Sequence, residues 1–291
     1  MLPSLAGFAR LSAIVVLLSG CPGQTDISFY VLVKSSNYAQ SSSGELTLLN
    51  YHFFSEIFLE DQGSLNRATL TIPNRDGRPF EYEDRGSNYY VEGGHFDSRE
   101  ELDSTYPNGS FIFDIETPTV RLSGQRLELA GPNGTTDLPQ PIRISLLQDD
   151  REVSPLEIIP EQELVIEWSD YSNGRADPRG IVDDMIFVVI ADCHGERRFH
   201  TGLPFQGEYL RFQATEVTVA ANTLSTGQPY SLFVEFPHVV DSRVTRGVPG
   251  FTSYATATYL DLHTTGPMSD LTCPDTPPPM DTGQTDRVER R

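Results

Sequence analysis

The sequence is short of positive charge, of lysine and of long hydrophobic segments. Its 291 residues carry 21 basic and 41 acidic side chains, a formal net charge of −20. Such a surface repels phosphates, so we expect no nucleic-acid partner and no basic patch for anionic lipid. Lys34 is the only lysine, which we attribute to codon usage.

The sequence also lacks the local motifs of common enzymes. None of its six histidines stands in a His-Glu-x-x-His helix, and neither a Gly-x-Ser-x-Gly elbow nor a phosphate-binding glycine loop occurs. We therefore predict no catalytic residue and no enzyme. A hydrolase whose nucleophile and base meet only in the folded chain is the least favoured alternative.

The N-terminal segment predicts export. After Arg10 comes an apolar run over residues 11–18, which is typical of a signal-peptide h-region and too short to span a bilayer. The run ends in Leu18-Ser19-Gly20-Cys21, which resembles the lipobox of bacterial lipoproteins. An ordinary signal peptide with a chance cysteine is the alternative.

The lipobox resemblance implies several further expectations. Residues 1–20 would be removed, Cys21 would carry the lipid, and residues 21–26 would form a tether. Residue 22 is Pro. In Gram-negative lipoproteins an Asp there resembles an inner-membrane retention signal, so the resemblance implies the outer membrane. The membrane partner would be reached through the lipid anchor.

The rest of the chain predicts an all-β protein. Short alternating apolar runs are separated by Gly, Pro, Asn, Asp and Ser clusters, and almost nothing has helical period. A Gly- and Pro-rich stretch at 131–141 divides the chain into two antiparallel β domains, 27–135 and 136–265. Residues 266–291 are expected to form a Pro-rich tail.

Three local features refine this pattern. Ser35-Ser36-Asn37 is expected to end the first strand, and Ser123-Gly124-Gln125 to form the turn of a hairpin. The acidic segment after Ser98 predicts a short helix that Ser98 caps.

The second domain resembles fibronectin type III and immunoglobulin-like sandwiches. Trp168 is placed on an inward face, and Leu224, Gly227 and Tyr230 open an alternating strand. In those families the tyrosine hydroxyl bonds a backbone group upstream, the tyrosine corner. The resemblance implies the same contact for Tyr230.

The cysteine count predicts one disulfide. Lipidation would consume Cys21 and leave Cys193 and Cys273 as an even pair in an oxidising compartment. The bond would pin the start of the tail to the second domain.

Two clusters are candidates for ligand binding. Five residues crowd one loop between predicted strands and could supply oxygen ligands to calcium, or form a solvated loop: Asp170, Asn173, Asp177, Asp183 and Asp184. Five aromatic residues could form a binding platform or, as we favour, part of the core: Tyr82, Tyr89, Tyr90, Phe96 and Tyr106.

We therefore expect a non-enzymatic, lipid-anchored cell-envelope protein with a binding, adhesion or structural role. Its partner would be a protein or glycan ligand, and no cofactor other than calcium is expected. The alternative is a carbohydrate-binding accessory module, which the aromatic residues and the acidic loop suggest. The ligand-binding residues are unknown at this stage.

Overall fold

The structure is a computed structural model, and it describes residues 25–60, 63–73, 78–86, 88–130, 138–268 and 272–274. The expected all-β class is confirmed, with one short helix in the described residues. Cys21, the signal peptide and nearly all of the Pro-rich tail lie outside these ranges.

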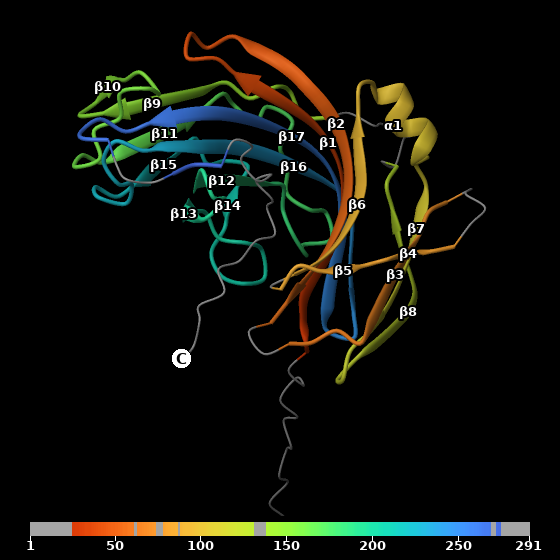
Figure 1. The fold of residues 1–291 in the computed structure, drawn as a ribbon. Coiled ribbons are helices and arrows are strands. Elements are labelled where there is room, and N and C mark those ends of the chain that lie inside the picture. The colour runs from red at the N-terminus through yellow and green to blue at the C-terminus, as the bar shows by residue number, and fades with distance from the viewer. Residues whose placement is uncertain are drawn as a thin grey trace, which may run out of the picture.

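One long, bent sheet runs through the whole molecule (Figure 1). Its strands lie in the order β13-β12-β16-β17-β1-β2-β6-β5, and β14 pairs with β12. Their bounds are β1 Ile27–Gln40, β2 Leu46–Leu59, β5 Glu83–Asp84, β6 Asn88–Phe96, β12 Met185–Asp192, β13 Arg197–His200, β14 Leu210–Arg211, β16 Pro229–Thr245 and β17 Val248–His263.

Two four-stranded sheets pack against this long sheet and enclose separate cores. The first sheet has the order β4-β3-β7-β8, with β3 Arg67–Thr71, β4 Phe80–Glu81, β7 Ser110–Glu116 and β8 Arg121–Glu128. The second has the order β10-β9-β11-β15, with β9 Ile144–Gln148, β10 Arg151–Glu152, β11 Leu164–Trp168 and β15 Glu216–Val219. Tyr254 of β17 lies in the first core and Leu260 of the same strand in the second. Tyr254 and Leu260 are separated by six positions, and residues at even separations in a strand point to the same face. Both small sheets therefore cover the same face of the long sheet.

The first and last strands of the fold lie side by side. β1 pairs with β17 in parallel, in a register that runs from Tyr30 opposite Gly250 to Gln40 opposite Leu260. This is an exception to the antiparallel pairing expected throughout. The sequence predicted a domain boundary between residues 135 and 136. The long sheet contains strands from both sides of that boundary.

The first strand does not end at its polar residues, so that prediction is wrong. Ser35, Ser36 and Asn37 lie inside β1 and are buried. β1 is a central strand, and two of these side chains bond to polar partners on its neighbours: Ser36 Oγ lies 3.0 Å from Thr256 Oγ1, and Asn37 Nδ2 donates to Asn50 Oδ1 at 2.8 Å. Paired polar side chains are tolerated in such a position.

The predicted hairpin at Ser123-Gly124-Gln125 is also wrong. Ser123 and Gly124 form a bulge opposite Asp114 within the single strand β8, which pairs with β7 on both sides of the irregularity. Asp114 of β7 accepts hydrogen bonds from Ser123 Oγ at 2.9 Å and from Gly124 N at 2.8 Å. The Asp114 carboxylate satisfies the donors of the bulge, so β8 continues along β7 instead of turning back.

The expected helix is present as α1, Arg99–Thr105, in which the Ser98 side chain accepts from Glu101 N.

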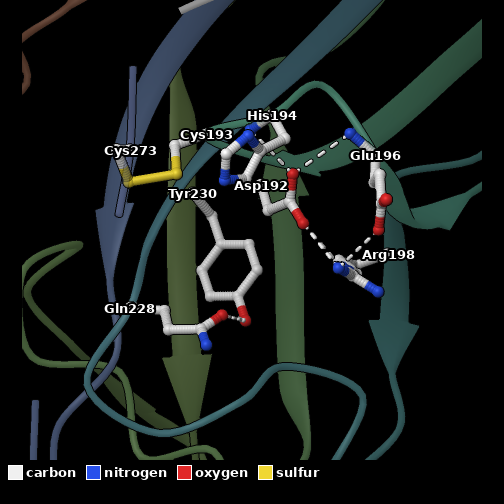
Figure 2. The surroundings of a disulfide bond; sticks show 8 residues. All are labelled: Asp192, Cys193, His194, Glu196, Arg198, Gln228, Tyr230 and Cys273. Carbon is white, nitrogen blue, oxygen red and sulfur yellow. Dashed lines mark hydrogen bonds and ion pairs between the residues drawn. A yellow bond between two sulfur atoms is a disulfide. The ribbon is translucent and has the colours of Figure 1, made fainter. Parts of the chain in front are cut away.

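The contact expected of Tyr230 is present too. The buried hydroxyl accepts a hydrogen bond of 2.8 Å from Ser225 N, upstream in the chain, and donates to Gln228 Oε1 at 3.0 Å (Figure 2). Trp168 points into the second core, as predicted.

The predicted disulfide joins Cys193 to Cys273, with Cα atoms 5.5 Å apart (Figure 2). Cys193 directly follows β12, where the buried Asp192 carboxylate accepts from His194 N and Glu196 N and pairs with Arg198. The bond encloses a sequence separation of 80 residues. A loop of that size corresponds to roughly 4 kcal/mol of stabilisation in the chain-entropy description.

The Tyr230 contact leads to the first testable outcome. Tyr230→Phe keeps the buried ring but leaves Ser225 N without its acceptor, so we expect the free energy of unfolding to fall by about 1–2 kcal/mol. Chemical denaturation with intrinsic fluorescence measures the change. A midpoint equal to that of the parent chain would show that this hydroxyl does not fix the corner.

Candidate functional site

A pocket of about 250 Å³ opens on the face of the long sheet that the two small sheets leave uncovered. β2 and β6 supply its most polar wall, and β1, β16 and β17 also contribute residues. His52 on β2 lies opposite His95 on β6, and Glu92 precedes His95 by three residues. These three side chains form the group in the described residues whose ligand atoms lie close enough together to hold a metal ion.

A β-bulge brings Glu92 and His95 to one face. Residues three apart in a regular strand point to opposite faces. Here His52 pairs with His95 and Phe54 with Glu92, so Gly93 and Gly94 together face the single residue Phe53. The extra residue resets the alternation.

The bulge depends on its two glycines. A Cβ on Gly93 would lie 2.2 Å from the Phe53 ring and 2.6 Å from the Phe53 carbonyl oxygen. Gly94 has a φ of +96°, a conformation that side-chain-bearing residues rarely adopt. Gly93 and Gly94 therefore permit the bulge that directs the Glu92 and His95 side chains to the same face of the sheet.

The three side chains touch one another. His52 Nε2 lies 2.8 Å from Glu92 Oε1, and the His52 and His95 rings stack with centroids 4.1 Å apart. Glu92 Oε1 also accepts from Gly94 N at 2.8 Å, which fixes the carboxylate to its own bulge. His52 is mostly buried, whereas Glu92 and His95 are exposed. One ligand atom from each of the three lies within 4.8 Å of the others.

The surroundings set the charge of this group. Partial burial raises the pKa of Glu92, but the hydrogen bond and charge of His52 outweigh it and lower that pKa to about 2. Partial burial, together with the charge of His52, lowers the pKa of His95 below its usual value. At neutral pH the site therefore presents a carboxylate and a neutral imidazole, the forms that bind metals.

A second layer of polar residues orients His95. Its Nδ1 lies 3.0 Å from Asn50 Oδ1, which also accepts from Asn37 Nδ2. A carbonyl oxygen only accepts, so His95 Nδ1 carries the proton and Nε2 keeps its lone pair. Such a partner on the second ring nitrogen is typical of metal-ligating histidines. Two imidazoles and one carboxylate form a ligand set for zinc that leaves a fourth position for water or a ligand.

The acidic loop does not converge on one point. No three of its carboxylates lie within 4.8 Å of one another in the part of the chain described. Asp177 instead accepts from Ser242 Oγ and from three backbone N–H groups of its own loop, and Asp184 accepts from Arg175 N and Val239 N. Asp183 accepts from Asp177 N, whereas Asp170 and Asn173 are exposed. These contacts stabilise the loop, and calcium binding stays a prediction.

The aromatic residues pack as core, which confirms the interpretation we favoured. Tyr106 and Tyr90 are buried, and the Tyr106 ring stacks on Phe53 with centroids 3.9 Å apart. Tyr82, Tyr89 and Phe96 are partly buried against the first core. The five rings therefore form no exposed platform.

Sequence reasoning missed the His52, Glu92 and His95 group because its members come from two strands. The one local signal was Glu92-Gly93-Gly94-His95, in which two potential ligands flank two residues that favour a bulge.

No protein-family model and no curated protein matches this chain. Two solved structures to which it is weakly similar are the BSP domain of a biofilm-associated protein and the Yersinia pseudotuberculosis adhesin InvE. Their identities are 9% and 10%, their TM-scores 0.20 and 0.17, and each alignment covers 80% of this chain. The chain spans 30% and 61% of those two proteins. Likeness at this level carries no argument about function.

Proposed function

We propose that this chain is a lipid-anchored binding protein of the cell envelope, and that its ligand enters the pocket at His52, Glu92 and His95. The observation that carries the proposal is the bulge that aims Glu92 and His95 at His52 within a pocket on a rigid sheet. The ligand set favours a divalent transition metal such as Zn²⁺, either alone or as the bridge to a larger ligand.

Two features support the envelope location. The N-terminal segment resembles a lipoprotein signal, and the Cys193–Cys273 bond is of the kind that persists in oxidising compartments. Within the described residues no helix has the length and apolar character needed to cross a membrane. The attachment that we propose is the lipid on Cys21, which the lipobox resemblance implies.

A second candidate function is metal-dependent hydrolysis. Two histidines and a glutamate that leave one position open are also the ligand set of catalytic zinc. Such a site lowers the pKa of a bound water and so generates a nucleophile. Binding is preferred because it needs only the three ligands, whereas hydrolysis also needs an activated water in the open position and a substrate held beside it.

The metal site can be tested by titration. We expect the purified chain to bind one Zn²⁺, and His52→Ala, Glu92→Gln and His95→Ala each to weaken that affinity by at least about tenfold. Isothermal calorimetry with zinc alone measures this. His194→Ala is the matched control, because His194 is an exposed histidine outside the pocket. No zinc binding by the parent chain, or an equal loss in the control, would refute the site.

The lipid anchor can be tested separately. Cys21→Ala removes the only sulfur at the lipobox-like segment, so we expect the chain to leave the membrane fraction and to keep its signal peptide. Fractionation after a carbonate wash, with the mass of the N-terminal peptide, measures both effects. A variant that still partitions with membranes would contradict anchoring at Cys21 without affecting the zinc result.

A further inference from the structure

The only lysine of the chain is buried in the first core. Lys34 is 1% exposed and lies between Phe53 of β2 and Tyr254 of β17 in the register of the long sheet. Its side chain points toward α1 and the segment that follows it, where Asp103 and Asn108 lie.

Two side chains contact the Lys34 amine, and the Tyr254 hydroxyl contacts one of them. Nζ lies 2.6 Å from Asp103 Oδ1 and 2.8 Å from the side-chain oxygen of Asn108. The Tyr254 hydroxyl lies 2.9 Å from that same Asn108 oxygen and 3.0 Å from Leu129 O, and its one proton can bond either acceptor. The Lys34 amine therefore lies beside the Asn108 carboxamide, and the Tyr254 hydroxyl is a second donor to the oxygen of that group.

We propose that Lys34 Nζ and the side-chain carbonyl carbon of Asn108 react to form an intramolecular amide, an isopeptide bond, with Asp103 as the proton acceptor and Tyr254 as the donor to the carbonyl oxygen. This inference goes beyond the proposed function, because the four residues lie on the opposite face of the sheet from the pocket.

The chemistry balances without an added reactant. The Lys34 ammonium gives one proton to Asp103, and the free amine attacks the Asn108 carbonyl carbon. Charge develops on the carbonyl oxygen, where the Tyr254 hydroxyl donates. The bond from that carbon to the amide nitrogen then breaks, and the nitrogen takes up a proton and leaves as ammonia. One C–N bond replaces another, with no change in oxidation state.

Burial of Lys34 and Tyr254 favours the attack by the amine and the donation to the carbonyl oxygen. Burial lowers the pKa of Lys34, in spite of the opposing hydrogen bond and charge of Asp103, and so promotes the neutral, nucleophilic amine. Burial raises the pKa of Tyr254, so the hydroxyl keeps the proton that it donates. The fold holds the Lys34 amine beside the Asn108 carbonyl, so the reaction does not pay the entropy cost of bringing the two groups together.

The choice of lysine also fits a covalent role. Arginine supplies 20 of the 21 basic residues, and the one lysine lies in a core. A buried cation is costly there unless it is well paired. Only a primary amine can form this bond, because a guanidinium stays protonated and is a poor nucleophile.

The bond would join β1 to the connection between α1 and β7. β1 begins at Ile27, close to the proposed anchor at Cys21, so tension on the chain enters the fold through this strand. A covalent link at Lys34 would carry that tension into the first core without relying on hydrogen bonds alone.

Peptide mass spectrometry of the full chain tests the proposal. Trypsin cleaves after unmodified Lys34 and releases residues 35–67, whereas an amide at Nζ blocks that cut. After reduction and denaturation we expect the 35–67 peptide to be lost. In its place we expect a branched peptide that joins the segment ending at Arg67 to residues 100–121, lighter by one ammonia than its two parts. Complete release of 35–67 from the folded, aged parent chain would overturn the proposal.

Matched variants test the roles of the neighbours. Asp103→Asn removes the proton acceptor and should restore the cut after Lys34, whereas Asp97→Asn, at an exposed residue nearby, should leave the branched peptide intact. Tyr254→Phe should slow formation of the branched peptide in freshly made chain. Circular dichroism of each variant separates loss of reaction from loss of fold. A well-folded Asp103→Asn chain that is still fully cross-linked would refute the role of Asp103.

Discussion

The parallel pairing of β1 with β17 is the contact on which the rest of the structure depends. It joins the first strand of the fold to the last, in register from Tyr30 and Gly250 to Gln40 and Leu260. β2, β6 and β5 extend the sheet on one side of this pair, and β16, β12 and β13 on the other. Without it, each small sheet would cover only a fragment of the long sheet. The pairing is slow to form in principle, because it joins residues that are 220 apart in the chain, as Tyr30 and Gly250 are.

The two faces of the long sheet have different roles, and the alternation of β1 divides them residue by residue. Leu32 and Lys34 face the first core, whereas Ser35 and Asn37 line the pocket on the other face. The reactive group that we propose and the lining of the pocket therefore use neighbouring residues of β1 without sharing a side chain. A shift of one residue in the register of β1 would exchange these faces and destroy both.

Sequence patterns predicted the features that depend on contacts between residues close in the chain or on the number of cysteines. The Ser98 cap, the Tyr230 contact and the Cys193–Cys273 pair all follow from short motifs or from an even cysteine count. The failures have a common physical cause. Ser35 to Asn37 read as a break because their partners, Thr256 and Asn50, come from other strands. Ser123 to Gln125 read as a turn because Asp114, which satisfies them, lies on β7. The candidate metal ligands in the pocket were missed because they come from two strands, and strand pairing and a bulge bring them together.

The central claim is that the two halves of the chain form one cooperative unit through β1 and β17. Urea unfolding followed by two probes tests it most directly. The fluorescence of Trp168, the only tryptophan, reports the second core, and far-ultraviolet circular dichroism reports all the sheets. We expect a single transition with the same midpoint for both probes. A Trp168 transition separate from that of the remaining sheet signal would show two independent domains.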